Sequence, residues 1–276
     1  MIAIVLALAA ILGLSIGSFL NVVIYRVPAG KSIVAPPSAC PNCNHHIEAR
    51  DNVPLVSWLM LRGKCRNCAA PISVRYPLVE AGTAIFFVLV ALLYAPPLLD
   101  STRTLTAVAN LLVLVSFLYL CAISVALAMI DLDVNRLPNA IVLPAYAVAA
   151  VTLTVASVIT GDYGQLFRAG VGMAALALLY FVIVMVYPGG MGFGDVKLAG
   201  VLGAYLGWSG WGALITGSLL AFLLGSIFGG VLILLGRKGR KSGIPFGPWM
   251  VAGAWVGIGF GGFLWSNYLS VFGLTI

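Results

Sequence analysis

Long apolar runs alternate with shorter polar segments along almost the whole chain. Most of them approach the roughly 20 residues that an α-helix needs to cross a lipid bilayer. One run, residues 196–206, is short and interrupted by glycine. The pattern predicts an all-α polytopic membrane protein of about eight transmembrane helices. These helices are expected at residues 2–24, 77–94, 105–130, 140–159, 167–187, 196–206, 211–235 and 246–268.

The first polar segment, residues 26–76, is the only one long enough to form a domain outside the membrane. It follows a first transmembrane helix at 1–25. No basic residue precedes the apolar run of that helix, so we expect a retained span and not a cleaved signal peptide. Residues 77–276 are expected to form one membrane-embedded domain of about seven helices.

The composition excludes an ordinary soluble domain. Of the 276 residues, 62% are hydrophobic and only 8% are charged, whereas soluble domains carry about 25% charged residues. The net charge of +7 would suggest a nucleic-acid partner in a soluble protein. In a membrane protein it is better explained by basic residues in cytoplasmic loops. We therefore expect the lipid bilayer, and no nucleic acid, as the surrounding partner.

The distribution of charge predicts the orientation in the membrane. If all eight runs cross, every Lys and Arg except Arg103 and Arg168 falls on the same side as residues 26–76. Lys and Arg collect on the cytoplasmic side of membrane proteins. The polar domain is therefore expected in the cytoplasm, with both termini on the opposite side.

Two C-x-x-C pairs lie in the polar domain, one formed by Cys40 and Cys43 and the other by Cys65 and Cys68. Four thiolates at this spacing match a structural zinc site of the ribbon type. A pair of disulfides or free thiols is the alternative, although a reducing cytoplasm disfavours the disulfides. Because four thiolates leave no open position for water, the zinc ion would be structural and not catalytic.

Two aspartates at the predicted cytoplasmic helix ends are the candidate catalytic residues. Asp131 follows the apolar run 105–130, and Asp195 precedes the run 196–206. Paired aspartates can share one proton, so that one acts as a base on water while the other acts as an acid. Asp133 should point in a different direction from Asp131, and we expect it to face water or to pair with Arg136.

A glycine-rich segment, residues 188–197, surrounds the second aspartate. Glycines allow a tight turn and the close approach of another backbone. We therefore expect Gly192, Gly194 and Lys197 to form an active-site loop around Asp195. The residues alone leave catalysis and ordinary charges at the membrane interface as equally good explanations of the aspartates.

Taken together, these blocks resemble the type IV prepilin peptidase family, a group of Gly-x-Gly-Asp intramembrane aspartic proteases. The resemblance covers nearly the whole chain and is carried by blocks in the family's order. These blocks are residues 17–28, the two cysteine pairs, residues 52–59, 75–80, 131–139 and 192–197.

The resemblance implies cleavage of the basic leader from prepilins and pseudopilins of type IV pilus and type II secretion systems, at the cytoplasmic face of the bacterial inner membrane. The family's catalytic aspartates match Asp131 and Asp195. Bacterial members with the cysteine-bearing domain also methylate the new N-terminal amine with S-adenosylmethionine. Glu80 lies in a block associated with that activity, and the residues by themselves predict no methyl-donor site.

Two other functions fit parts of the pattern. A proton- or cation-coupled membrane transporter would use the same aspartates and interrupted helices. A membrane scaffold without enzymatic activity would use the cysteine-bearing domain to recruit a partner. Neither explains why carboxylates from two spans share one side of the membrane beside a glycine-rich turn.

Overall fold

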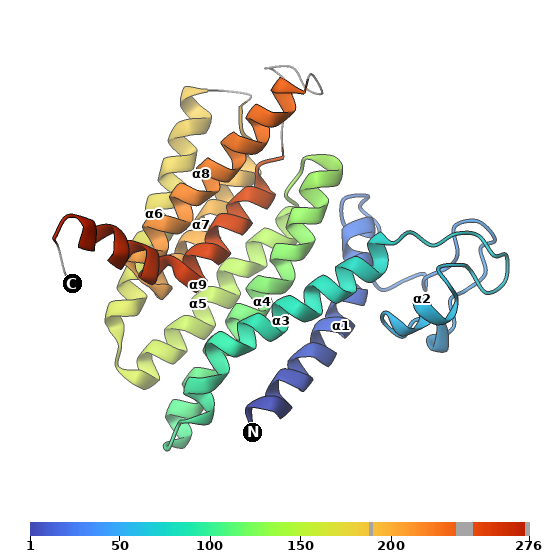
Figure 1. Cartoon of the computed structure of the whole chain (residues 1–276), viewed down its shortest axis with the longest axis horizontal. Helices are drawn as coiled ribbons and strands as arrows, with labels where there is room; N and C mark the ends of the chain where they lie inside the picture. The colour runs from blue at the N-terminus through green and yellow to red at the C-terminus, as the bar shows by residue number, and fades with distance from the viewer. Residues whose placement is uncertain (188–189, 236–244, 274–276) are drawn as a thin grey trace.

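A computed structural model of the chain describes residues 1–187, 190–235 and 245–273 (Figure 1). Residues 188–189 of the glycine-rich segment and the basic residues of 237–241, which contributed to the charge argument, lie outside the described residues. Long α-helices joined by short connections make up most of the described chain.

Among the residues that the structure describes, seven helices are long and apolar enough to cross a membrane. This finding confirms the predicted class of all-α polytopic membrane protein, and no β-strand longer than an isolated bridge occurs in the described residues. The helices are α1 (Ile2–Arg26), the short α2 (Val56–Met60), α3 (Arg75–Leu99), α4 (Thr104–Val134), α5 (Asn139–Thr160), α6 (Tyr163–Val186), α7 (Phe193–Ser209), α8 (Trp211–Leu234) and α9 (Gly247–Val271).

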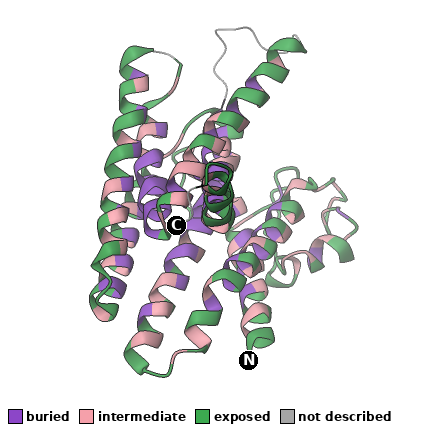
Figure 2. Ribbon diagram, turned by 60° about the vertical axis from the view of Figure 1, so that its left-hand side comes forward, coloured by how far each residue is buried: buried purple, intermediate pink, exposed green. Residues whose placement is uncertain are grey.

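The eighth expected span is α7, which is longer than the apolar run 196–206 suggested. Its 17 residues extend over about 25 Å, close to the lower limit for crossing a bilayer. Every residue from Leu198 to Trp208 is buried, and buried residues concentrate in the interior of the bundle (Figure 2). Because α7 packs against α4, α5, α6, α8 and α9, it needs no lipid-facing stripe.

The contacts at the helix ends show that α7 runs through the bundle. Leu137, in the α4–α5 connection, packs close to Gly194 at the start of α7 and to Gly247 at the start of α9. The starts of α7 and α9 therefore lie at the same end of the bundle. It follows that α7 leads away from this end and α8 returns to it.

Glycines set the closest helix pairs. A Cβ at Gly13 of α1 would lie 2.6 Å from the Cα of Ala84 in α3, and a Cβ at Gly257 of α9 would lie 2.7 Å from the Cα of Gly217 in α8. A Cβ at Gly203 of α7 would collide with the backbone of α6. In lipid the hydrophobic effect does not drive helices together, and small residues stabilise their association by allowing close packing. These glycine contacts therefore hold the bundle in register.

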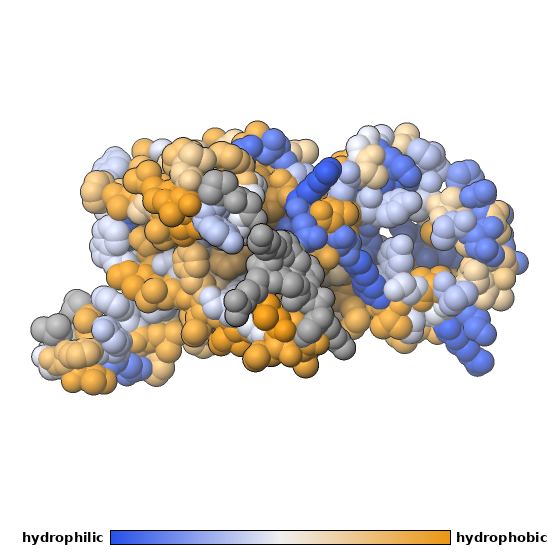
Figure 3. All heavy atoms as spheres, turned by 90° about the horizontal axis from the view of Figure 1, so that it is seen from above, coloured by the Kyte–Doolittle hydropathy of each residue, from blue (hydrophilic) through white to orange (hydrophobic). Residues whose placement is uncertain are grey.

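The polar segment between α1 and α3 forms a small module beside the bundle, which we call the cysteine module (residues 27–74). It lies next to the α1–α3 pair and is seen at the right of Figure 1. Viewed from above, hydrophilic residues are concentrated on the side of the module, whereas hydrophobic residues dominate the bundle (Figure 3). The module is therefore the main water-exposed part of the described chain.

Candidate active site and metal centre

Asp131 lies in the last turn of α4 and is buried, with 5% of its surface exposed. The helix ends shortly after it, because Asn135 adopts the left-handed conformation (φ 50°) and its N–H closes the final turn on the Asp131 carbonyl. The carboxylate accepts a hydrogen bond from the backbone N–H of Gly247 through Oδ2, at 2.9 Å. Asp131 is therefore held at the N-terminal end of α9, where helix N–H groups and the helix dipole favour an anion.

Asp195 lies in the first turn of α7 and is also buried, with 8% of its surface exposed. Its Oδ2 accepts the backbone N–H of Gly192 at 2.9 Å, while its own N–H donates to the Gly192 carbonyl at 3.0 Å. The bond from the Gly192 N–H to the Asp195 carboxylate is the one that the side chain contributes to a capping box, which fixes the start of a helix. The glycine-rich segment thereby orients Asp195 within its own helix.

The two aspartates are brought together around one side chain. A Cβ at Gly194 would lie 3.0 Å from the Cβ of Leu137, and a Cβ at Gly247 would lie 3.3 Å from Leu137 Cδ2 and 2.9 Å from Asp131 Oδ2. Leu137 thus lies beside Gly247, which binds Asp131, and beside Gly194, which precedes Asp195. Residues separated by 64 positions in the sequence form one buried polar site.

Asp133 points away from Asp131, as their spacing on the helix requires. Of the two expected placements, exposure to water fits, since 37% of the Asp133 side chain is accessible, but its ion-pair partner is not Arg136. The carboxylate accepts two hydrogen bonds from Arg75, the first residue of α3, at 2.8 and 2.5 Å. The α4–α5 connection carries Arg136 beyond the helix, whereas the start of α3 lies directly beside its last turn. Sequence spacing along one helix could not reveal a partner from another helix.

Lys197 lies one turn after Gly194 and joins α7 to the start of α5. Its Nζ donates to the side-chain oxygen of Asn139 at 2.9 Å, and its carbonyl accepts the hydroxyl of Tyr146 at 2.6 Å. Lys197 is half-buried, and its contacts connect the start of α7, which carries Asp195, to α5, which follows the end of α4. These contacts set the position of α7 relative to the α4–α5 connection.

The apolar pattern does not distinguish Gly247, the residue that binds Asp131, from the rest of an ordinary span. Pro245 and Pro248 nevertheless flank a Phe-Gly pair at the start of that span. Proline in the first turn favours a helix start, and this signal was available. The ring of Phe246 is held between Tyr180 of α6 and Phe222 of α8, with centroids 6.1 and 5.6 Å away, which orients the following amide.

The four module cysteines form a cluster in which all sulfur atoms lie within 4.8 Å of one another. The Sγ atoms of Cys40 and Cys68 are 3.8 Å apart, and tetrahedral ligands at about 2.3 Å from a zinc ion have their sulfur atoms about 3.8 Å apart. All are free thiols and not disulfides. The donor set and its spacing therefore fit a metal ion.

The two cysteine pairs share one turn geometry. In the first pair, the N–H of Cys40 binds the His45 carbonyl and Asn44 has a φ of 55°. In the second, the N–H of Cys65 binds the Ala70 carbonyl and Ala69 has a φ of 56°. This equivalence explains why the four sulfur atoms converge.

Hydrogen bonds prepare two of the thiols for the metal. Bonds from the backbone of Ala70 and from the Asn42 side chain lower the pKa of the Cys68 thiol to about 6. Backbone bonds from Cys43 and Asn42 lower the pKa of the Cys40 thiol. The thiolate is the form that binds a metal, so these contacts favour the ligand state.

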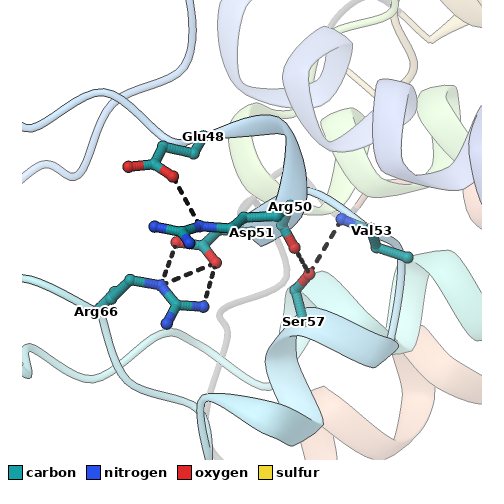
Figure 4. Close-up of polar contacts among 6 residues, drawn as sticks. All are labelled: Glu48, Arg50, Asp51, Val53, Ser57 and Arg66. Atoms are coloured by element: carbon teal, nitrogen blue, oxygen red, sulfur yellow. Dashed lines mark hydrogen bonds and ion pairs between the residues drawn. The ribbon is translucent and has the colours of Figure 1, made fainter.

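Ion pairs and hydrogen bonds fix the connection between the cysteine pairs (Figure 4). Arg66, between the second pair of cysteines, binds both carboxylate oxygens of Asp51 at 2.6–3.0 Å, which lowers the pKa of Asp51. The Ser57 hydroxyl donates to the Arg50 carbonyl and accepts the N–H of Val53. The segment from 50 to 57 is therefore tied both to the second cysteine pair and to α2.

Glu80 connects the module to the bundle. It lies one turn into α3, is 9% exposed, and its Oε2 accepts the backbone N–H of Leu55 at 2.8 Å. Leu55 has a positive φ of 59°, which is strained for a leucine. The carboxylate therefore holds a strained turn of the module against the membrane domain.

Comparisons with known proteins agree with the resemblance seen in the sequence. A family model described as "Bacterial Peptidase A24 N-terminal domain" matches residues 11–94, and one described as "Type IV leader peptidase family" matches residues 118–234. The first region contains the cysteine module and Glu80, and the second contains both aspartates. No solved structure matches the chain.

Relatives named "Prepilin leader peptidase/N-methyltransferase" cover nearly the whole chain. The protein from Aeromonas hydrophila is 38% identical, with 96% of this chain and 94% of the relative aligned. The protein from Stutzerimonas stutzeri is 35% identical over 95% of this chain and 92% of the relative. The protein from Pseudomonas putida is 33% identical over 97% and 95%. With similarity of this extent and two matching family models, the chain belongs to the type IV leader peptidase family.

Proposed function

We propose that this protein removes the leader from prepilins and pseudopilins with Asp131 and Asp195 as its catalytic pair, and then methylates the new N-terminal amine. The observation that supports the proposal is the burial of two carboxylates, at the end of α4 and the start of α7, in segments that both pack near Leu137 in a chain of this family. Family membership favours a peptidase over the transporter and the scaffold, which the residues alone had left open.

Asp131 and Asp195 act together on one water molecule. The ionised carboxylate takes a proton from the water while the water oxygen attacks the scissile carbonyl carbon, and the protonated carboxyl gives its proton to the carbonyl oxygen. When the tetrahedral intermediate collapses, the C–N bond breaks, the first carboxyl gives the water proton to the leaving amine, and a hydroxyl of the intermediate returns a proton to the second carboxylate. In the described structure Oδ2 of each aspartate accepts a backbone N–H, and these bonds hold the two carboxylates in place.

The substrate is an apolar helix with a short basic leader. Such a helix lies alongside the transmembrane helices in the bilayer, which leaves its leader in water at the end of the bundle. Asp131 and Asp195 lie at that end of α4 and α7, so the scissile bond meets them at the membrane boundary. A buried site at this depth protects the reacting bond from competing water.

Cleavage takes place at the cytoplasmic face of the bacterial inner membrane. Arg26 at the end of α1, Arg75 at the start of α3 and Lys197 in α7 belong to the end of the bundle that carries the aspartates. Arg103 and Arg168 belong to the opposite end. A cysteine introduced at Glu48 in a variant lacking Cys121 should add labelling by a membrane-impermeant maleimide, beyond that of the Cys121-free parent with its four module cysteines, only in inside-out vesicles. Added labelling in intact cells would reverse the orientation.

A structural zinc ion is held by Cys40, Cys43, Cys65 and Cys68. When bound, it would supply folding energy to a module most of whose apolar side chains remain exposed. The thiols close the coordination shell, so the ion takes no part in cleavage. Metal analysis of the purified protein should find one zinc ion per chain, and its absence in fully active protein would refute this assignment.

The methylation activity uses S-adenosylmethionine, which supplies the methyl group, and it rests on the names of the relatives. Glu80 is better suited to a structural role than to contact with the methyl donor, because its carboxylate is buried and bound to Leu55. A mature pilin peptide with a free N-terminal amine, incubated with labelled methyl donor, tests this activity separately from cleavage. Labelling by wild-type protein supports it, and its absence contradicts it.

Leader release from a purified prepilin-like substrate in detergent tests the peptidase. We expect Asp131→Asn and Asp195→Asn each to abolish release, because neither amide can exchange the proton that hydrolysis requires. Asp100→Asn, an exposed carboxylate after α3, is the matched control and should retain wild-type activity. Full activity of Asp131→Asn, or of Asp195→Asn, would remove that residue from the catalytic pair.

A further inference from the structure

The last turn of α4 is fastened to the first residue of α3. The guanidinium of Arg75 donates to both carboxylate oxygens of Asp133, at 2.8 and 2.5 Å. Two parallel bonds between planar groups fix both distance and orientation, unlike a contact from a flexible lysine. The partners are 58 residues apart in the sequence, so the pair joins two separate transmembrane helices.

This contact lies where the catalytic helix would otherwise be least restrained. Helix ends lack part of their internal hydrogen bonds and fray, and α4 ends at Val134, three residues after Asp131. Asp133 belongs to the same turn as Asp131, although its side chain faces a different direction. A pair that fixes Asp133 therefore also fixes the backbone that carries the Asp131 carboxylate.

The start of α3, which carries Arg75, is itself held by hydrogen bonds to α1 and to the cysteine module. The carbonyl of Tyr76, next to Arg75, accepts the side-chain N–H of Asn21 in α1 at 3.2 Å. One turn further on, Glu80 holds the N–H of Leu55 in the cysteine module at 2.8 Å. The first turns of α3 thus contact α1 and the module, and Arg75 joins them to α4.

We propose that Arg75 is a positioning residue for peptide-bond cleavage, which acts through Asp133 to hold the Asp131 carboxylate on the Gly247 amide. The inference rests on the proposed function of Asp131. The pair itself is partly exposed, with 40% of the Arg75 and 37% of the Asp133 side chain accessible, and exposed ion pairs add little to stability. Its loss therefore changes the geometry of the site more than the folding of the protein.

The experiment measures kcat and KM for leader release by the full chain in detergent, together with the unfolding temperature. We expect Arg75→Ala and Asp133→Ala each to lower kcat about tenfold or more, because small misplacements of a catalytic group cost that much. KM should stay within about twofold and the unfolding temperature within about 4 °C. The double variant should be no worse than either single variant, because both remove the same contact.

Two further variants separate positioning from charge. The charge reversal Arg75→Asp combined with Asp133→Arg rebuilds the pair in the opposite sense and should recover much of the lost kcat. Arg136→Ala removes a positive charge at the same helix end, where Arg136 has no acidic partner within the described residues, and it should leave kcat unchanged.

Three results would overturn the proposal. Unchanged kcat in Arg75→Ala, with Asp131→Asn inactive, would refute the positioning role while leaving the proposed function intact. If the decreases in kcat multiplied in the double variant, Arg75 and Asp133 would not act through one shared contact. If Arg136→Ala lowered kcat as much as Arg75→Ala, the effect would come from charge and not from this pair. Absence of cleavage by the wild-type protein would refute the proposed function itself.

Discussion

The cysteine module and the aspartate site are built in opposite ways. The module takes its ligands from two short turns of one continuous segment, and each turn has the same backbone bonds and the same left-handed residue after its second cysteine. The aspartate site combines the end of α4, the start of α7, the start of α9 and the connection that carries Leu137. One site is local in sequence, and the other depends on how helices pack.

This difference predicts how each site responds to damage. A local site depends on its ligands and on the conformation of a few residues, so a change there should remain within the module. A site assembled from several helices depends on close backbone contacts, so a single methyl group placed between helices can separate its parts.

The largest effect should come from removal of the metal ligands. Replacing Cys65 and Cys68 by serine removes half of the cluster, and structural zinc contributes about 10 kcal/mol or more to folding of such modules. We expect loss of zinc by metal analysis and rapid proteolysis within residues 27–74, with the helical circular dichroism signal of the bundle retained. Methylation should fall more than cleavage.

The control for the cysteine variant is Cys121→Ala, which removes a buried thiol of α4 outside the cluster and should keep the metal. If the double serine variant unfolded the whole bundle, or lost cleavage as completely as methylation, the module would not be the independent unit that its local construction implies.

The second effect concerns the amide that binds Asp131. A Cβ at Gly247 would lie 2.9 Å from Asp131 Oδ2, so Gly247→Ala must push the carboxylate from its hydrogen bond. We expect kcat to fall about a hundredfold, equal to about 2.7 kcal/mol of transition-state stabilisation. Gly259→Ala, on the same helix with open space around it, should change kcat less than twofold. Equal activity of the two variants would remove Gly247 from the site.

A smaller loss of kcat is expected from a change at Gly194, which contacts Leu137 from the start of α7. A Cβ at Gly194 would lie 3.0 Å from Leu137 Cβ, whereas the nearest atom to a Cβ at Gly192 is Asp195 Oδ2 at 3.5 Å, an ordinary contact. We expect Gly194→Ala to lower kcat about tenfold, or about 1.4 kcal/mol, and Gly192→Ala to lower it less. Assays of leader release compare them directly, and the reverse order would contradict the contact with Leu137.

The smallest effect should be a gain of stability within the module. Ala69 has a φ of 56°, a conformation that costs a residue with a Cβ about 1 kcal/mol. Ala69→Gly should stabilise the second cysteine turn by about that amount, seen as slower proteolysis or amide hydrogen exchange of the module. Ala70→Gly lacks this strain and should not stabilise it, and neither change should alter cleavage. An effect of Ala69→Gly on cleavage would mean that the two sites are coupled.

Much of the fold could be predicted from the sequence because apolar runs report membrane helices directly. The run 196–206 was the least regular, and it became α7, a helix of 17 residues buried through most of its length. A central helix surrounded by others can be short and rich in glycine, since it needs no lipid-facing side chains. Which helices surround it cannot be inferred from its own composition.

The candidate site was predicted only in part. Asp131 and Asp195 stood out because a carboxylate next to an apolar run is costly. Gly247 has no functional side chain that a sequence pattern could identify. Its role depends on a backbone N–H, which the packing of α9 against α4 directs at Asp131. The partner of Asp133 was missed for the same reason, because Arg75 comes from another helix.

The sequence by itself determined the membrane class, the cysteine cluster and the two aspartates, because each depends on residue type and short spacing. Tertiary structure decided which backbone amides hold the aspartates, that Leu137 lies beside both Gly194 and Gly247, and that Arg75 reaches Asp133. Those contacts join segments far apart in the chain, and their distances follow from helix packing through small residues such as Gly203 and Gly257. Local patterns specify the chemical groups, and the close approach of helices brings them together.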